Sequence, residues 1–230
     1  MLRSPYIEII GLAGSGKSTL RDQLIEEARK IGHNYRYRQQ LNFNFLQRVQ
    51  ILIKSFRFLF IHLSILKWVM ARPSGPYSIT PHSNKIIKNL KFRIIIESVI
   101  VRNMLASDPI TFINDEGIIG KAVVLSLLLE KDSSELYTFL NVLLPTEMQV
   151  LFVEIKGAKA IQQMYDRKVS LPFWDEMDRQ LKVKLFDNCN ARYLDLIQSL
   201  STRKGLSYFI IPNNGSKEEL FASMIEHISN

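Results

Sequence analysis

One stretch of eight residues, Gly11-Leu-Ala-Gly-Ser-Gly-Lys-Ser18, constrains the fold of this chain more than any other feature. It fits the pattern G-x-x-x-x-G-K-[ST], follows the strand-like run Tyr6–Ile10 and precedes a helical pattern over Lys17–Ile31. In that order, strand, glycine turn and helix form a loop whose backbone N–H groups point at phosphate oxygens beside the positive end of the helix dipole. The motif therefore predicts a nucleotide-phosphate site.

The residue types of this phosphate loop suit that chemistry. Glycines let the backbone curl, the Lys17 ammonium can reach the β- and γ-phosphates, and the Ser18 hydroxyl is the usual Mg²⁺ ligand. The predicted nucleotide-binding residues of the loop are Gly11, Ala13, Gly14, Ser15, Gly16, Lys17, Ser18 and Thr19.

Alternating strands and helices follow along the whole chain. Further strands are predicted at Asn34–Arg38, Ile110–Asn114, Met148–Ile155 and Ser207–Ile211. Helices are predicted at Ile86–Ser107, Ile118–Lys131, Ser133–Leu144, Ala158–Lys168 and Asp175–Ser201, and Ser216 with Glu219 predicts the start of a last one. This pattern predicts an α/β fold in one domain over residues 1–230, with a mostly parallel sheet covered on both faces.

A second candidate site is Asp115, which ends the predicted strand Ile110–Asn114. In open parallel sheets the carboxyl ends of the strands line the ligand crevice. An acid there can bind the magnesium ion or accept a proton from an attacking hydroxyl, and Glu116 is the neighbouring candidate. Alternatively, Asp115 caps the helix that follows Gly117. Because the phosphate loop predicts a site at this edge, we favour the functional role.

The positive charge of the chain is concentrated in residues 34–102. The chain has a net charge of +8, and this segment alone holds twelve Lys and Arg residues but a single acid, Glu97. Such a segment attracts phosphates, nucleic acid or an anionic membrane surface. Its aromatic residues follow helical spacing and not a base-stacking pattern, so no nucleic acid partner is expected.

Within this basic segment, residues 41–91 form a predicted apolar helical insert. Phe45–Met70 reads as one long helix with only a narrow polar stripe. Two interpretations are open: a helix buried between neighbours, or a surface that contacts lipid or a partner. Burial is favoured, because wide apolar faces usually belong to the core.

The remaining composition excludes several classes. With one cysteine, Cys189, and four scattered histidines, neither a disulfide within the chain nor a zinc site is expected, and a cytoplasmic location is favoured. The most apolar run, Phe58–Leu66, is too short to span a membrane, so any membrane contact would be peripheral, at the inner face.

In its order of elements the chain resembles the nucleoside monophosphate kinases, and thymidylate kinase most of all. The resemblance is carried by the phosphate loop, Arg93 placed 22 residues before Asp115, Asp115 itself, the run Tyr165-Asp-Arg167-Lys168, and the tail segments Asn190–Leu196 and Phe209–Leu220. It implies a three-layer P-loop NTPase fold with a five-stranded parallel sheet, a short lid with a catalytic Arg167, ATP as donor, and a homodimer. It also implies that Arg93 binds the acceptor and that Asn213 lies near the adenine.

Departures from that family fall on the acceptor side, which the insert 41–91 is expected to form. Tyr35-Arg-Tyr-Arg-Gln-Gln40 stands where thymidylate kinases carry Arg-Glu-Pro, and Glu116 follows Asp115 where they carry Arg. We therefore expect ATP to be retained as donor and the acceptor to differ from thymidylate. Arg36, Arg38 and Arg93 are expected to converge on this acceptor.

Three functions remain open. The favoured one is a kinase whose acceptor is a sugar or a lipid-linked glycan of surface polysaccharide, held at an anionic membrane surface. The second is a thymidylate or other nucleoside monophosphate kinase, and the third is a nucleotide-binding switch without kinase chemistry.

Overall fold

The computed structural model describes residues 4–30, 32, 35–37, 41–72, 81–107, 111–115, 117–167, 178–204, 206–213 and 219–222. Five strands form one sheet in the order β2-β3-β1-β4-β5, and every neighbouring pair is parallel. The strands are β1 (Tyr6–Gly11), β2 (Tyr35–Tyr37), β3 (Thr111–Asn114), β4 (Gln149–Glu154) and β5 (Ser207–Pro212). The predicted five-stranded parallel sheet is confirmed.

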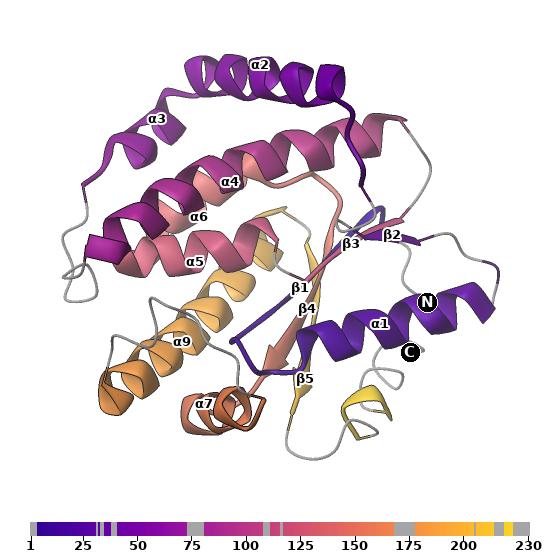
Figure 1. Cartoon of the computed structure of the whole chain (residues 1–230), viewed down its shortest axis with the longest axis vertical. Coiled ribbons are helices and arrows are strands. Elements are labelled where there is room, and N and C mark those ends of the chain that lie inside the picture. Colours follow the sequence, from indigo (N-terminus) through magenta and orange to yellow (C-terminus); the bar gives the residue numbers. More distant parts are fainter. Residues whose placement is uncertain are drawn as a thin grey trace.

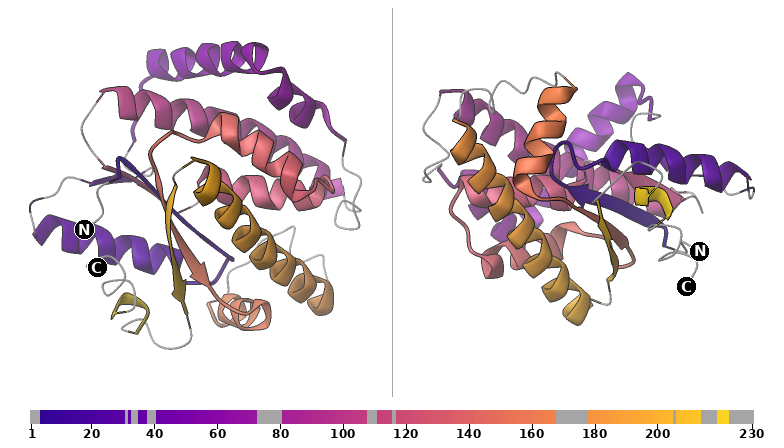
Figure 2. Two further views of the ribbon diagram at one scale, coloured as in Figure 1. Left: turned by 180° about the vertical axis from the view of Figure 1, so that it is seen from behind. Right: turned by 90° about the horizontal axis from the view of Figure 1, so that it is seen from below.

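Helices cover both faces of this sheet (Figure 1). They are α1 (Lys17–Lys30), α2 (Phe45–Ile61), α3 (Leu63–Met70), α4 (Pro81–Ser107), α5 (Ile118–Leu128), α6 (Ser133–Leu143), α7 (Gly157–Asp166) and α9 (Arg179–Lys204). Seen from below, α1 lies on one side of the strands and α9 on the other (Figure 2). The predicted three-layer α/β architecture is thereby confirmed.

The central strand β1 is buried along its whole length because both of its faces are covered. Ile7 and Ile9 belong to the apolar cluster that includes α1. Tyr6 and Ile10 belong to the larger cluster on the opposite face, which α4, α5, α6 and α9 complete. Side chains that alternate along a strand therefore serve two separate cores.

The predicted single helix over Phe45–Met70 is instead broken in two. His62, with φ −113° and ψ 81°, leaves the helical region, and α2 is bent by 107° from the helical residues Ser64–Met70. The break lets α3 turn inward, where Trp68 is buried and stacks on Phe139 of α6 with ring centroids 4.2 Å apart. The gain from burying these aromatic rings offsets the interrupted helix.

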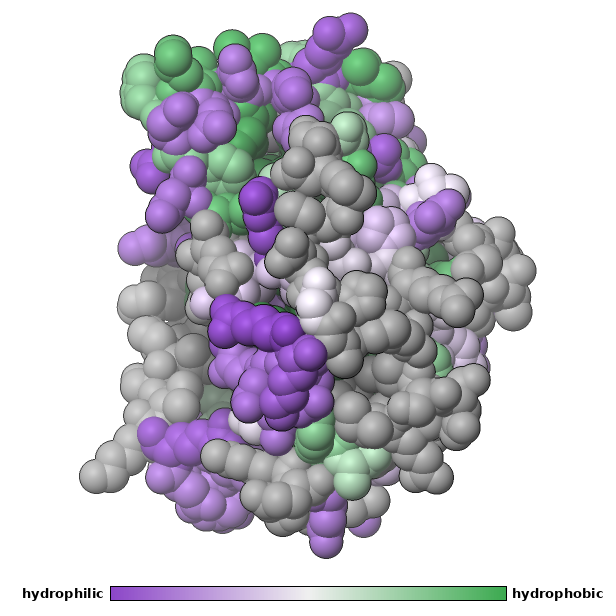
Figure 3. All heavy atoms as spheres, turned by 90° about the vertical axis from the view of Figure 1, so that its right-hand side faces the viewer, coloured by the Kyte–Doolittle hydropathy of each residue, from purple (hydrophilic) through white to green (hydrophobic). Residues whose placement is uncertain are grey.

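The expectation that this segment is buried between neighbours is wrong for α2. Only Ile51, Ser55 and Leu59 of α2 are buried, because α2 packs along one side on α4 and leaves its other side outward. The helix lies at the top of the molecule (Figure 1), and Figure 3 shows hydrophobic and hydrophilic residues side by side there.

Two smaller differences concern α4 and membrane spans. The helix α4 starts at Pro81, five residues before the predicted start, since proline is tolerated in the first turn. Among the described residues no single helix is long and apolar enough to cross a membrane, and only the bent pair of α2 with Ser64–Met70 has a suitable length and composition. The predicted lid, from residue 168 onward, and the capping residue Ser216 lie outside the described residues.

Candidate nucleotide and acceptor site

The phosphate loop is held in shape by close backbone packing. Gly11, Gly14 and Gly16 have positive φ angles of 144°, 83° and 96°, which side chains rarely allow. A Cβ at Gly14 would lie 2.5 Å from the carbonyl oxygen of Ala160 in α7, and one at Gly11 would lie 2.6 Å from that of Val153 in β4. Glycine at these two positions lets the loop curl against β4 and α7.

The Lys17 ammonium binds carbonyl oxygens of the phosphate loop itself. Its Nζ donates to the carbonyl oxygens of Gly11 at 3.0 Å and Leu12 at 2.6 Å. These carbonyls hold the ammonium at the centre of the loop, from which it can reach a bound phosphate.

Asn213 supports the phosphate loop from the end of β5. It is buried, its side-chain amide donates to the carbonyl oxygen of Ser15 at 2.7 Å, and its backbone N–H donates to Glu154 at 2.8 Å. The resemblance places this residue near the adenine. In the structure its side chain holds the loop backbone at Ser15.

Asp115 meets the phosphate loop, as expected for a residue at the end of β3. Its Oδ2 accepts hydrogen bonds from Ser18 Oγ at 2.9 Å and from Arg21 Nη1 at 2.8 Å. Hydroxyl and carboxylate oxygens are the ligands that Mg²⁺ prefers, usually one or two from the protein with phosphate oxygens beside them. The side chains of Ser18 and Asp115 therefore fit a magnesium ion bound with a nucleotide.

Arg21 is a site residue that the sequence reasoning missed. It lies one helical turn after Ser18 on α1, and its side chain is only 10% exposed. Besides Asp115 it binds Asp22 at 2.7 Å, and its guanidinium lies over the ring of Tyr37 at 5.3 Å. The signal in the sequence was the spacing of three from Ser18, which puts both on one face of the helix.

The N-terminus of helix α5 is capped by the side chain of Glu8, not by that of Asp115. The N-cap residue of α5 is Gly117, which has no side chain, and Glu8 Oε1 accepts from the backbone N–H groups of Ile119 at 2.7 Å and Gly120 at 3.2 Å. A Cβ at Gly117 would lie 2.2 Å from the Glu8 carboxyl carbon. The absence of a side chain at Gly117 is what admits this carboxyl to the start of the helix.

A cluster of buried polar groups surrounds Glu8. The Tyr6 hydroxyl donates to Glu8 Oε2 at 2.9 Å, and Lys121 pairs with the neighbouring Glu97 at 2.8 Å. Burial, with the nearby charge of Glu97, raises the pKa of Glu8 to about 7. Glu8 thus holds a proton more readily than an exposed carboxyl.

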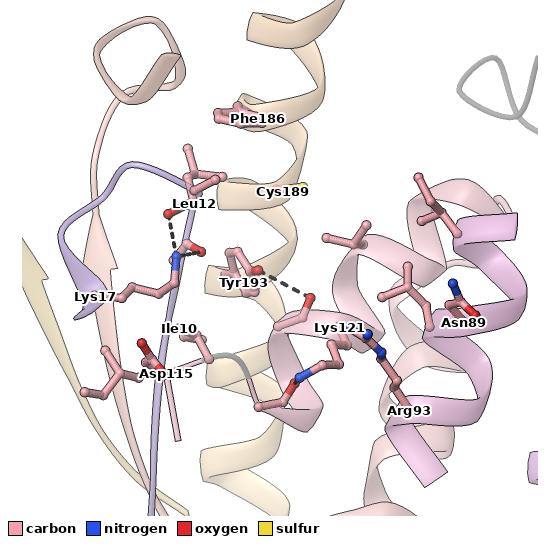
Figure 4. Close-up of a pocket in the computed structure, with 18 of the residues that line it drawn as sticks. Ile10, Leu12, Lys17, Asn89, Arg93, Asp115, Lys121, Phe186, Cys189 and Tyr193 are labelled. Atoms are coloured by element: carbon pink, nitrogen blue, oxygen red, sulfur yellow. Dashed lines mark hydrogen bonds between the residues drawn. The ribbon is translucent and has the colours of Figure 1, made fainter. Parts of the chain in front are cut away.

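A cavity of about 520 Å³ opens between the phosphate loop and helices α4, α5 and α9. In Figure 4, Lys17 and Asp115 lie on the side of the sheet, and Asn89 and Arg93 of α4 lie on the far side. The cationic lining residues are Lys17, Lys85, Arg93 and Lys121, and the one acidic lining residue among those described is Asp115. Much of the remaining wall is apolar, from Ile86, Leu90, Val124, Phe186, Cys189 and Tyr193.

The predicted acceptor arginines are only partly brought together. Arg93 lines the cavity with Lys17 and Asp115, but Arg36 is exposed on β2 and does not. Arg167 is an exposed residue that ends α7, and it does not line the cavity either. Arg38 and Glu116 lie outside the described residues. Within the insert 41–91 the lining residues come from α4, while α2 and α3 contribute none that the structure describes.

Among family models, curated proteins and solved structures, only the solved structures match this chain. No model of a protein family matches the chain, and no curated protein does. Among solved structures, deoxyadenosine kinase from M. mycoides with bound dATP matches with a TM-score of 0.56 and 13% identity, over 98% of this chain and 100% of that one. The structure of the same kinase with the products dCMP and dCDP matches with a TM-score of 0.56 and 12% identity, over 97% of this chain and 98% of that one. The structure of that kinase with bound dCTP matches with a TM-score of 0.54 and 13% identity, over 97% of this chain and 98% of that one. Over nearly its whole length, the chain therefore shares the fold of this deoxyadenosine kinase.

Proposed function

We propose that this protein is an ATP-dependent kinase that phosphorylates a nucleoside or a nucleoside monophosphate. The observation that carries the proposal is the shared cavity: Lys17 and Asp115 of the candidate phosphate site line the same space as Arg93 and the apolar wall. A donor phosphate in the loop and an acceptor in the cavity would meet there, and positioning supplies much of the rate in phosphoryl transfer.

The shape and lining of the cavity suit a nucleoside. Its volume of about 520 Å³ is in the range of small-molecule sites. Apolar and aromatic side chains, among them Leu90 and Tyr193, offer surfaces for a base, while Arg93 and Lys85 offer donors to a sugar or phosphate.

The likeness to deoxyadenosine kinase also supports a particular class of acceptor. The comparisons support the second of the three functions predicted from the sequence better than the favoured one, since the matched structures are of a nucleoside kinase. They give no support to a sugar or glycan acceptor, and we do not retain it.

In the proposed reaction an acceptor oxygen bonds to the γ-phosphorus while the bond to the β–γ bridging oxygen breaks and ADP leaves. Lys17 leaves the carbonyls of Gly11 and Leu12 to bind the phosphates. Magnesium, when bound, would neutralise charge on the phosphates, and Ser18 with Asp115 would hold it. Arg93 binds the acceptor, and a hydroxyl acceptor would pass its proton to Asp115, which lines the cavity, or to Glu116, the next residue in the sequence.

The test is ADP release with ATP and Mg²⁺ in the presence of deoxynucleosides, nucleoside monophosphates, or free sugars. We expect release with one of the first two classes and none with sugars. Turnover of sugars alone would overturn the nucleoside assignment. No turnover of any acceptor, together with ATP binding, would favour the switch without kinase chemistry.

Lys17→Ala should abolish this release with the fold intact, because it removes the cation aimed at the transferred phosphoryl group. Lys30→Ala, an exposed cation at the far end of the same helix, is the matched control and should retain activity. Retained turnover in Lys17→Ala would contradict the kinase proposal.

A further inference from the structure

The outward side of α2 is an apolar surface that the described residues leave largely exposed; only its Phe56 ring makes an aromatic contact, with the half-exposed Phe92 of α4. We call it the α2 outer face. Its side chains are between 36% and 78% exposed. They are Phe45, Leu46, Val49, Ile53, Phe56 and Phe60. Their spacings of three, four and seven put them on one side of the helix, opposite the buried Ile51, Ser55 and Leu59. An apolar patch of this kind on a monomer usually marks an interaction surface.

The helices of this segment, α2 and α3, carry cations and no acid. Arg48, Lys54, Arg57 and Lys67 are exposed on α2 and α3. The sequence contains no Asp or Glu from residue 34 to residue 96. Three aromatic rings and several aliphatic chains beside fixed cations are complementary to a surface that is apolar inside and anionic outside, which describes an anionic bilayer.

The position of α2 allows the face to be covered without closing the candidate active site. The cavity is lined by residues of α4 between Lys85 and Arg93. The helix α2 contacts residues of α4 that do not line the cavity. Lys54 donates to Asn103, Ile51 packs in a cluster with Val99 and Ile100, and the Phe56 ring packs edge-on against Phe92. Helix α4 therefore stands between the outer face and the sheet (Figure 1), so docking through α2 leaves the cavity walls in place.

The bend at His62 decides how α2 would meet a bilayer. The following helix α3 is anchored inward by buried Ile65 and Trp68. A helix that turns by 107° into the protein core cannot continue across a membrane. An α2 that lies flat with its apolar side down fits the geometry of an interfacial helix.

A second copy of the chain fits the face less well. In a two-fold contact the same patch meets itself, so the cations of this segment in one copy would lie near those of the other, and the segment has no acid to separate them. We propose that the α2 outer face docks this protein onto anionic phospholipid bilayers, with Phe56 and Phe60 inserted and Arg57 bound to lipid phosphates. This inference does not depend on the proposed phosphotransfer.

The test is co-sedimentation of the full chain with vesicles of phosphatidylcholine alone or of phosphatidylcholine with phosphatidylglycerol. We expect binding to the anionic vesicles, little binding to the neutral ones, and weakening by salt. The double change Phe56→Ser and Phe60→Ser should reduce binding by about tenfold or more, since buried apolar area sets the strength of an interfacial helix. Tyr208→Ser, which removes an exposed ring on β5, is the matched control.

Arg57→Glu tests the electrostatic attraction between α2 and anionic lipid, and the exposed side chain can be replaced without leaving a cavity. It should lower binding to anionic vesicles by about fivefold or more, whereas Lys184→Glu, an exposed cation on α9, should leave it unchanged. The proposal is overturned if the folded wild-type protein ignores anionic vesicles, or if both α2 variants bind as the wild type does. It is also overturned if the wild type is a dimer that these variants dissociate, because a second copy would then occupy the face.

Discussion

At the scale of single residues, Asp115 and Glu8 show how two acids near the start of α5 have different roles. Asp115 is partly accessible, faces the cavity and binds Ser18 and Arg21. Glu8 is wholly buried and accepts two backbone N–H groups of α5. Access to the cavity makes Asp115 available to a ligand, while burial gives Glu8 a structural role.

Asp115→Asn should lower the turnover number by about 10²- to 10⁴-fold with a much smaller change in ATP affinity. The reason is that the amide keeps the size of the side chain but removes the charge that would bind magnesium or accept a proton. Steady-state kinetics and nucleotide titration separate the two effects. If Asp115 holds the metal, raising the Mg²⁺ concentration should restore part of the activity, and Glu116→Gln measures the neighbouring acid in the same way. Full activity in Asp115→Asn would remove Asp115 from the site.

Gly117→Ala should destabilise the fold by about 1–3 kcal/mol, since overpacking forces buried groups apart. The added methyl would lie 2.2 Å from the Glu8 carboxyl carbon. Urea unfolding measures the loss. Gly120→Ala, in the helix that Gly117 precedes, is the control, because its Cβ would meet nothing closer than the Tyr193 hydroxyl at 3.7 Å. Equal stability of the two variants would contradict the close packing of Glu8 against Gly117.

At the scale of elements, α5 and α4 line the cavity in different ways. The N-terminus of α5 is fixed by a carboxyl from β1, so its position is coupled to the strand that leads into the phosphate loop. The helix α4 passes the cavity with Asn89 and Arg93 turned toward it (Figure 4). One element is therefore tied to the donor side, and the other supplies candidate acceptor contacts.

The Glu8 carboxyl at the start of α5 should make the free energy of unfolding depend on pH. The pKa of Glu8 is raised from 4.5 to about 7, so between these values the folded state keeps a proton that the unfolded chain releases. Stability should therefore fall as pH rises from 4.5 to 7, by on the order of 3 kcal/mol. Glu8→Gln, which keeps the acceptor oxygen, should remove this fall, and the exposed Glu147→Gln should not. A flat stability profile in the wild type would contradict the raised pKa.

Arg93→Gln should raise the Michaelis constant of the acceptor by about tenfold or more, since a charge-assisted contact is lost, with ATP affinity unchanged. Lys88→Gln is the control, because Lys88 is exposed on the same helix but does not line the cavity. Lost thermal stability with unchanged kinetics would instead show that Arg93 has a structural role, and its assignment to the acceptor would be dropped.

At the scale of the whole molecule, the site lies where β1 and β3 end and where helices from both faces of the sheet approach. Lys17 and Ser18 come from α1 on one face, and Arg93 comes from α4 on the other. Ligand sites of open parallel sheets occur at this edge because neighbouring strands send the chain to opposite faces there.

Nucleotide binding should stabilise the whole domain. At a concentration about 100 times the dissociation constant, ATP with Mg²⁺ should add about 2.7 kcal/mol, seen as a higher melting temperature. Lys17→Ala should show a much smaller rise. Equal shifts in the two proteins would mean that the nucleotide does not bind through Lys17.

The sequence by itself determined the phosphate loop, the five strands and the parallel α/β fold, because these depend on local patterns: glycine spacing, apolar runs and helical periodicity. It also placed Asp115 beside the loop, since the ends of parallel strands meet at one edge. Only the tertiary structure showed that Arg21 binds Asp115, that Glu8 caps α5 and that Arg36 does not line the cavity. The exposure of α2 was decided there too, because periodicity records which side of a helix is apolar but not whether another element covers it.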